Sequence, residues 1–208
     1  MPVLLSTAYF PPILYFKNIY NAKNVIIEIN DNYTKQTYRN RTKILSANGV
    51  ISLSFPVINT HNKKIKTKDI QIDYSTAWQK NHYKTILSAY KSSPFFDYYI
   101  DYFLPFFNKK YKFLIDFNTK ILEQLFYAFD IKKNISFTNE YKHNTQNIND
   151  LREDFNTKKN HIQEKYCIKY RQVFSDRFDF TPNLSILDML FNLGPESEIF
   201  LSKKTYMI

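Results

Sequence analysis

The sequence predicts an α/β protein: a mixed sheet that opens with a parallel βαβ unit, then an aromatic-rich helical middle and a C-terminal capping helix. Three observations predict this class. Two short apolar runs enclose a helical pattern within the first thirty residues, apolar and aromatic residues recur at helical spacing between residues 113 and 129, and a serine-led apolar segment ends on a glycine. With 208 residues, 44% of them hydrophobic, the chain can bury one core, so we expect a single domain over residues 1–208.

The first element pair predicts a parallel βαβ unit. Residues 3–8 are short and apolar, and Pro12 suits the first turn of a helix over residues 13–22, because that turn needs no amide donor. Residues 24–29 form a second apolar run. Two strands joined by a crossover helix are parallel, so residues 6–12 should lie at the carboxyl edge of the sheet, where open α/β sheets bind ligands.

A β-hairpin is predicted next. Residues 42–45 and 50–57 flank the pair Asn48-Gly49, and Asn-Gly before an alternating apolar strand is a strong hairpin signal. Residues 69–74 predict a further strand.

The middle of the chain predicts three helical segments. The first begins at residue 76, the second covers residues 95–107 with an interruption at Pro105, and the third covers residues 108–131. Their apolar and aromatic residues recur every three or four positions, which predicts that most of them belong to the core rather than to a stacking surface.

The C-terminal third is more polar until its last helix. Residues 135–138 predict a strand, and residues 139–163 predict a surface excursion because they form the most polar stretch of the chain. Ser185 followed by Asp188 resembles a capping box, and Gly194 suits the left-handed position after a helix.

The net charge of +10 suggests an anionic partner, but the type of basic residue weakens that inference. Only five of the 29 basic residues are arginines, and the lysines are spread along the whole chain. A nucleic-acid surface usually concentrates Arg and Lys on one element. We therefore interpret most of the charge as a compositional background and do not expect a nucleic-acid partner.

Several classes of protein are not expected. No apolar run approaches the roughly 18 residues of a membrane helix, and the N-terminus lacks the pattern of a signal peptide. Cys167 is the single cysteine, which favours a reducing, cytoplasmic location and an inert thiol. His61 and His161 lie in polar stretches and are given no role. The sequence predicts no metal site, specifies no cofactor, and leaves the oligomeric state open.

The densest candidate for ligand binding precedes the hairpin. It comprises Lys35, Gln36, Arg39, Asn40 and Arg41. Arginine is scarce in this chain and binds phosphate or carboxylate through paired N–H groups. The block therefore predicts an anion site, and the alternative is an exposed polar strand.

Two further residues could perform acid–base chemistry. His82 is a candidate general base near neutral pH, and the alternative is a core histidine packed beside Trp78. Asp188 lies four residues before Asn192 on one helical face, where the pair could orient a histidine or bind a substrate. The alternative for Asp188 is the capping role described above. Gln172 precedes this helix, and its alternative is an ordinary strand face.

Six sequence blocks occur together in an order that resembles the WbqC-like family, in the short form found in Bacteroidetes. The blocks are LLSTAYFPP at residues 4–12, YTKQTYRNR at 33–41, WQKNH at 78–82, SAYKSSPFF at 88–96, YRQVF at 170–174 and LSILDMLFNLG at 184–194. Longer family members begin the first block with Gln-Pro, where this chain has Ser6 and Thr7.

The resemblance implies a role in the synthesis of surface polysaccharide such as lipopolysaccharide O-antigen. It implies acyl or aminoacyl transfer to the amine of a nucleotide-linked amino sugar, with that anionic small molecule as the partner. Matched block by block, it implies two catalytic residues, His82 and Asp188. The substrate-binding positions that it implies are Tyr9, Lys35, Gln36, Arg39, Asn40, Arg41, Tyr90, Gln172 and Asn192. A non-catalytic binding or scaffold protein in glycan assembly is the second hypothesis.

Overall fold

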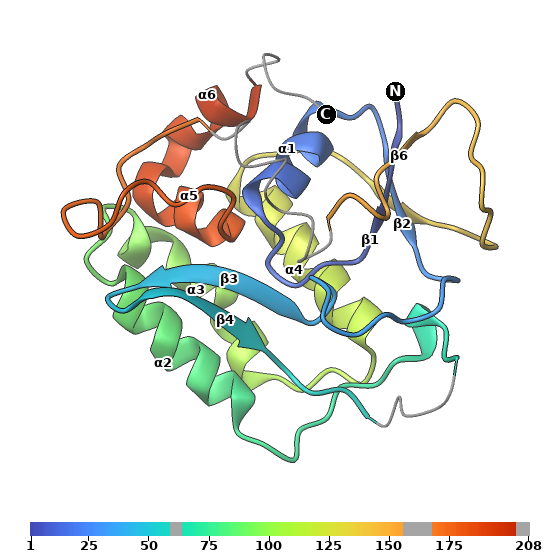
Figure 1. The fold of residues 1–208 in the computed structure, drawn as a ribbon, viewed down its shortest axis with the longest axis horizontal. Coiled ribbons are helices and arrows are strands. Elements are labelled where there is room, and N and C mark those ends of the chain that lie inside the picture. The colour runs from blue at the N-terminus through green and yellow to red at the C-terminus, as the bar shows by residue number, and fades with distance from the viewer. Residues whose placement is uncertain (59–63, 156–167, 203–208) are drawn as a thin grey trace.

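A computed structural model describes residues 1–58, 64–155 and 168–202 of the chain. Its main sheet has four parallel strands, β1 (Val3–Ser6), β2 (Val25–Glu28), β5 (Ile135–Phe137) and β6 (Asn149–Asp150), in the order β5-β2-β1-β6 (Figure 1). Helix α1 (Ile13–Asn21) connects β1 to β2. The predicted parallel βαβ opening and the α/β class are confirmed.

The opening strands are buried, as expected of parallel strands. Val3 pairs with Val25 and Leu5 with Ile27, and all four side chains belong to one apolar core. Because the register aligns the two strands from their first residues, their carboxyl ends lie side by side, at Ser6 and Glu28.

The start of α1 is held by a segment far away in the sequence. Pro12 offers no side-chain cap, and the first two amides of the helix donate to residues near the C-terminus instead. The Ile13 amide donates to the Leu184 carbonyl at 2.9 Å, and the Leu14 amide to Asn183 Oδ1 at 3.0 Å. These bonds satisfy two of the donors that a helix N-terminus leaves open.

The predicted hairpin is confirmed. It consists of β3 (Arg41–Ser46) and β4 (Gly49–Ser54), paired antiparallel. Gly49 has a φ of 98°, which explains why glycine stands at the end of this turn. The predicted strand over residues 69–74 is wrong, because this segment forms only single bridges to neighbouring segments after a short 3₁₀ turn, η1 (Thr67–Asp69).

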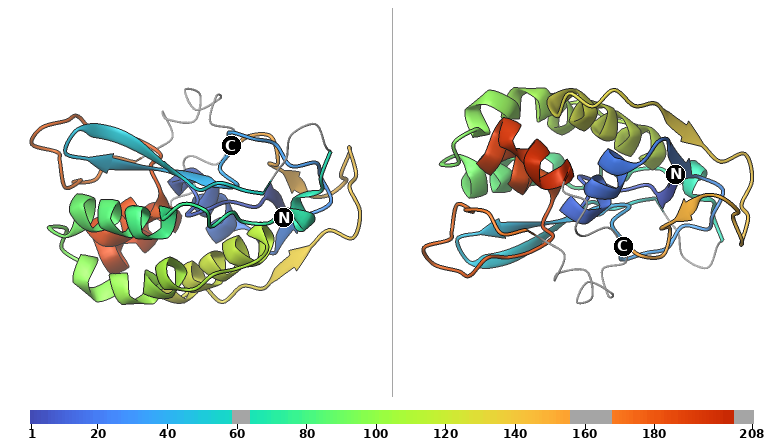
Figure 2. Two further views of the ribbon diagram at one scale, coloured as in Figure 1. Left: turned by 90° about the horizontal axis from the view of Figure 1, so that it is seen from below. Right: turned by 90° about the horizontal axis from the view of Figure 1, so that it is seen from above.

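Three helices form the aromatic middle: α2 (Trp78–Tyr90), α3 (Phe96–Asn108) and α4 (Leu114–Ala128). The hairpin lies on one side of the molecule and α3 and α4 lie on the other, with the C-terminal helix α5 between them (Figure 2). The prediction that the aromatic stripe belongs to the core is confirmed, since Phe117 and Leu125 are fully buried.

Two predicted boundaries in this middle are wrong. Pro105 does not interrupt α3, because the buried side chains of Phe103 and Phe106 hold the helix together across it. The Lys109 amide still donates to the Pro105 carbonyl at 2.9 Å. The third helix begins at Leu114, because Phe113 is extended and forms a bridge to Gln71.

The C-terminal elements are α5 (Ile186–Leu193), the turn η4 (Gly194–Glu196) and α6 (Ser197–Ser202). Ser185 caps α5 by accepting a hydrogen bond from the Leu187 amide, as predicted. Gly194 has a φ of 51°, and a Cβ there would lie 2.6 Å from the Phe95 ring. A side chain at this position is excluded both by the backbone conformation and by the close contact.

Part of the predicted surface excursion over residues 139–163 returns to the core instead. Residues 149–150 form β6 beside β1, and Leu151 and Phe155 are buried. Cys167, His61 and His161 lie outside the described residues. Among the residues that are described, no helix is long and apolar enough to cross a membrane.

Candidate functional site

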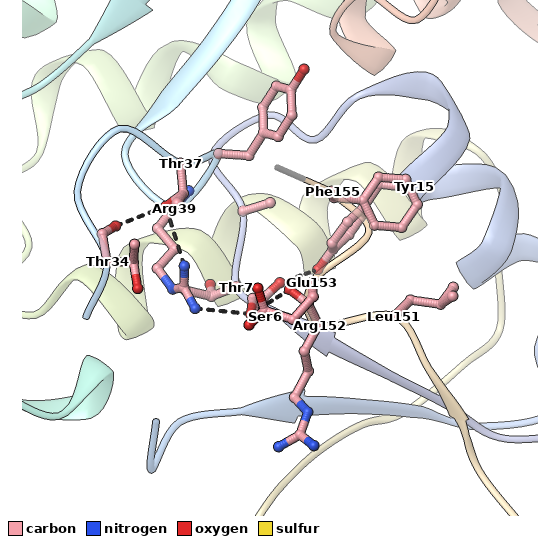
Figure 3. Close-up of a pocket in the computed structure, with 12 residues that line it drawn as sticks. Ser6, Thr7, Tyr15, Thr34, Thr37, Arg39, Leu151, Arg152, Glu153 and Phe155 are labelled. Atoms are coloured by element: carbon pink, nitrogen blue, oxygen red, sulfur yellow. Dashed lines mark hydrogen bonds between the residues drawn. The ribbon is translucent and has the colours of Figure 1, made fainter. Parts of the chain in front are cut away.

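A narrow crevice lies where the strand order reverses. The chain leaves β1 through α1 toward β2 on one side, whereas β6 flanks β1 on the other side. Strands β2 and β5 lie on one side of β1 and β6 lies on the other, and such a reversal of strand order is the usual ligand site of open α/β sheets. Residues 6–8 after β1 and residues 151–155 after β6 line this crevice (Figure 3). The prediction that residues 6–12 lie at the carboxyl edge is confirmed.

Arg39 is the central charged group of the crevice. Its side chain is 7% exposed, and its guanidinium points toward Ser6 (Figure 3). Nη2 donates to Ser6 Oγ at 3.0 Å and forms an ion pair with Asp31, while Nη1 donates to Thr37 Oγ1 at 3.3 Å. Asp31 is held in turn by the Thr67 hydroxyl. Asp31 therefore neutralises Arg39 from one side only.

One nitrogen of the Arg39 guanidinium makes no hydrogen bond within the described part of the chain. Its Nε is buried and has no hydrogen-bond partner there. A buried donor without a partner is unfavourable by about 1–3 kcal/mol. Because this atom has almost no accessible surface, a ligand oxygen reaches it only if neighbouring atoms move. The backbone around it is fixed, because Asn118 Nδ2 donates to the Arg39 carbonyl at 2.7 Å.

A second buried ion pair joins the strands below the crevice. Arg152 Nη1 lies 3.0 Å from Glu28 Oε2, and its Nε and Nη2 donate to Asp150 at 2.9 and 2.6 Å. Both Glu28 and the Arg152 side chain are almost fully buried. These residues are not among the predicted site residues, because Arg152 falls within the predicted surface excursion over residues 139–163; the available signal was a scarce arginine two residues after an aspartate.

The crevice has a narrow inner part and a wide outer part. The inner part has a volume of about 40 Å³, which is room for about three waters or one small anionic group. The outer hollow, of about 550 Å³, shares Thr34, Arg39, Arg152 and Glu153 with it. A ligand can therefore place a small charged group beside Arg39 and its larger part outside.

The other residues of the predicted anion block lie in different surroundings. Lys35 and Gln36 are exposed, and the Asn40 side chain donates to the Phe55 carbonyl at 2.7 Å, which ties the block to the hairpin. Arg41 begins β3, and its Nε is buried without a partner among the described residues. Burial raises the pKa of Tyr33 to about 12, although the positive charges of Arg39 and Arg41 act in the opposite direction.

His82 is a buried histidine between two fixed partners. Its Nδ1 lies 3.0 Å from the Tyr9 hydroxyl, and its Nε2 lies 3.2 Å from the Ser54 carbonyl oxygen. A carbonyl oxygen only accepts, so we assign the proton to Nε2, and Nδ1 then accepts from Tyr9. The ring also packs edge-on against Trp78, with a centroid separation of 5.2 Å. This arrangement matches the alternative interpretation of His82, a core histidine packed beside Trp78.

Burial lowers the pKa of His82 to about 4. The imidazole is therefore neutral at pH 7, and both of its nitrogens are engaged. His82 does not line the crevice around Arg39. The geometry does not support the expected role of His82 as the base that removes a proton from substrate.

Asp188 lies in a separate buried cluster. Its Oδ2 accepts from the Tyr170 hydroxyl at 2.5 Å and from Gln172 Nε2 at 2.9 Å. Burial raises the pKa of Asp188, although these hydrogen bonds act in the opposite direction. Its charge also raises the pKa of the buried Tyr90, behind the larger effect of burial. The Asp188 side chain thus does not cap its helix, and the capping alternative is wrong for this residue.

Asn192 and Gln172 line a third hollow, of about 510 Å³, beside the loop that contains Ser93. The Asn192 side chain donates to the Asp188 carbonyl at 2.8 Å, one turn earlier in the same helix. Neither Asp188 nor His82 lines the crevice that contains Arg39. The structure therefore separates the sequence-predicted site into a crevice at Arg39, a core pair at Tyr9 and His82, and a cluster around Asp188.

Within the described residues, no group of three or more His, Cys, Asp and Glu side chains could hold a metal ion. The model of the WbqC-like protein family matches residues 7–162 of the chain. Neither the curated proteins nor the solved structures yield a significant match. The matched range includes Arg39 and every other residue that lines the crevice except Ser6, and it ends before Asp188.

Proposed function

The chain belongs to the WbqC-like family, and from this premise we propose that it binds a nucleotide-linked amino sugar and acts in surface-polysaccharide assembly. We propose that it transfers an acyl or aminoacyl group to the sugar amine. The observation that carries the proposal is the crevice at the strand-order reversal, with a buried Arg39 whose Nε has no partner in the described chain.

The chemistry of the crevice suits a sugar phosphate. Arg39 lines the crevice, and a guanidinium can donate to a phosphate or carboxylate oxygen. The hydroxyls of Ser6, Thr34 and Thr37 lie around it. They donate to the carbonyls of Arg152, Asn32 and Thr34, so each must rotate to donate to a ligand oxygen instead. The inner volume limits the group beside Arg39 to roughly the size of one phosphate, and the outer hollow provides space for the rest of the nucleotide sugar.

Glu153 is the group that we assign to proton transfer. Glu153 lines both the inner and the outer part of the crevice. In the proposed step the amine nitrogen forms a bond to the acyl carbon of a thioester or ester donor. The leaving group departs with the bonding electrons, and Glu153 accepts the proton from nitrogen. His82 and Tyr9 position the loop instead, because the Tyr9 amide donates to the Tyr38 carbonyl, next to Arg39, at 2.8 Å.

A turnover assay tests this function. The protein is incubated with UDP- or dTDP-linked amino sugars and an acyl thioester, and the amide product is measured by mass spectrometry. We expect Glu153→Gln to lower the rate about 10²–10⁴-fold, which is the usual contribution of a general base. Glu140→Gln is the matched control, because Glu140 is an exposed carboxylate paired with Lys142 and does not line the crevice. Equal rates in the two variants would contradict the role of Glu153.

One observation favours the second function, a binding protein without catalysis. His82 and Asp188, the two residues expected to be catalytic, are both buried and hydrogen-bonded to other parts of the chain. If the nucleotide sugar binds at the crevice and no donor in the assay yields product, this second function is favoured over transfer.

A further inference from the structure

Another hollow lies at the opposite end of α1 from the crevice, and tyrosines form its walls. Tyr15, early in α1, lines the crevice, whereas Tyr20, near the end of the same helix, lines this hollow. The hollow has a volume of about 410 Å³. We refer to it as the tyrosine cleft, formed by Tyr98, Tyr99, Tyr102, Tyr127, Asp130 and Glu198.

The rings of the tyrosine cleft stand at steep angles to one another. The planes of Tyr98 and Tyr99 are inclined by 75°, those of Tyr99 and Tyr102 by 71°, and those of Tyr102 and Tyr127 by 73°. Tyr98 and Tyr127 are 68% and 69% exposed. Rings so arranged form walls that meet at an angle rather than a flat platform, and they leave aromatic surface open to solvent.

The charge of the cleft is opposite to that of the whole chain. Its two ionisable carboxylates are Asp130 and Glu198. The Asp130 carboxylate makes no hydrogen bond or ion pair with other described residues, and Glu198 accepts a hydrogen bond from the Tyr20 hydroxyl at 2.8 Å. The end of α4, which carries the negative pole of the helix dipole, also lines the cleft and has no basic residue in its last turn.

A lysine close to the cleft, Lys133, is already bonded to the end of α1. Lys133 Nζ donates to the carbonyls of Ile19, Tyr20 and Ala22 at 2.9, 2.5 and 2.5 Å. It also lies 6.0 Å from the centre of the Tyr20 ring. This ammonium group is satisfied by the end of α1, and Lys133 does not line the cleft. The carboxylates of the cleft are therefore left for another cation.

We propose that the tyrosine cleft binds a small organic cation with a primary ammonium group. The ring faces attract a cation through their quadrupoles, and the two carboxylates supply the opposite charge. The open volume accepts a sugar-sized body around that group. The inference does not depend on the function proposed for the crevice, which lies at the other end of α1.

Calorimetric titration at about 50 mM salt tests the proposal, because low salt preserves exposed charge interactions. The probes are glucosamine, the neutral N-acetylglucosamine, and an acetylated lysine amide with a free side-chain ammonium. Both ammonium probes should bind more tightly than the neutral sugar. Tighter binding of glucosamine assigns the cleft to an amino sugar, and tighter binding of the lysine derivative assigns it to a lysine side chain. Equal binding of the neutral sugar, or no binding of either ammonium probe, would overturn the proposal.

Variants at the rim locate the binding. Tyr127→Leu should weaken glucosamine binding about two- to fivefold, whereas Tyr127→Phe, which keeps the ring, should change it little. Asp130→Asn should also weaken it, and Glu123→Gln, an exposed carboxylate of α4 outside the cleft, should not. Arg39→Lys should leave it unchanged. Loss of amine binding in Arg39→Lys, or no effect of Tyr127→Leu and Asp130→Asn, would contradict the assignment to the cleft.

Discussion

At the scale of single residues, burial decides which polar groups can act on a ligand. His82 and Arg39 are both buried, at 5% and 6% exposure, yet their surroundings differ. Both nitrogens of His82 are engaged, whereas Arg39 keeps a buried Nε without a partner in the described chain. A sequence pattern does not distinguish these two cases, because both partners of His82, and Ser6 beside Arg39, come from distant segments.

His82 makes the stability of the fold depend on pH. Its pKa falls from 6.5 in the unfolded chain to about 4 in the folded protein, so the unfolded state binds the proton more tightly. The stabilisation is complete above about pH 6.5 and is lost as the pH falls toward 4, by on the order of 3 kcal/mol. Urea unfolding at pH 7 and pH 4.5 measures the loss.

A variant isolates this contribution from that of the carboxylates. His82→Gln keeps a neutral donor for the Ser54 carbonyl and removes the titrating group. We expect its free energy of unfolding to fall less between pH 7 and pH 4.5 than that of the wild type. His143→Gln, at an exposed histidine, should behave as the wild type does. The same pH dependence in the wild type and His82→Gln would show that His82 does not titrate as the structure indicates.

At the scale of elements, one ion pair attaches the last strand to the sheet. Arg152 follows β6, and its partner Glu28 ends β2, on the far side of β1. Arg152→Met leaves the buried Glu28 charge unpaired and should lower the free energy of unfolding by about 3–5 kcal/mol. Chemical denaturation measures this loss of stability. As a control, Lys120→Met breaks an exposed ion pair and should lower the free energy of unfolding by less than about 1 kcal/mol. The double variant Glu28→Gln/Arg152→Met should recover part of the loss, and no recovery would contradict a role for the pairing.

The two glycines give a matched test of turn and packing. Gly49 and Gly194 both have positive φ, but a Cβ at Gly49 would meet no atom within 4 Å, whereas one at Gly194 would meet the Phe95 ring. Gly49→Ala should cost about 1–2 kcal/mol for backbone strain alone, and Gly194→Ala about 2–5 kcal/mol. Thermal unfolding compares the two variants, and equal losses would mean that the contact with Phe95 relaxes freely.

Elements with local signals could be predicted from the sequence. The Asn48-Gly49 turn, the Ser185 cap and the opening strands depend on neighbouring residues, and all three are confirmed. The boundary at Pro105 could not be predicted, because the packing of distant aromatic side chains outweighs the local preference. Strand β6 has only two residues and gains its place through the Arg152 side chain, so no periodic pattern could indicate it.

At the scale of the whole molecule, the chain order of the strands creates the candidate site. The sequence predicted that the first connection would lie at the carboxyl edge, and it selected Arg39. The sequence could not indicate that residues 151–155 complete the crevice, because the pairing of β6 with β1 joins segments more than a hundred residues apart. The charge of +10 is a poor guide to the partner, since Arg39 and Arg152 are both paired with carboxylates.

Binding of a nucleotide-linked amino sugar at Arg39 is the measurement that matters most. Calorimetric titration of UDP- and dTDP-amino sugars should show binding to the wild type that is at least tenfold weaker in Arg39→Lys, because lysine lacks the paired donors of the planar guanidinium, an effect of roughly 1.4 kcal/mol or more. Arg177→Lys, at an exposed arginine remote from the crevice lining, should bind as the wild type does. No binding to the wild type, or equal affinity in Arg39→Lys and Arg177→Lys, would contradict a ligand site in this crevice.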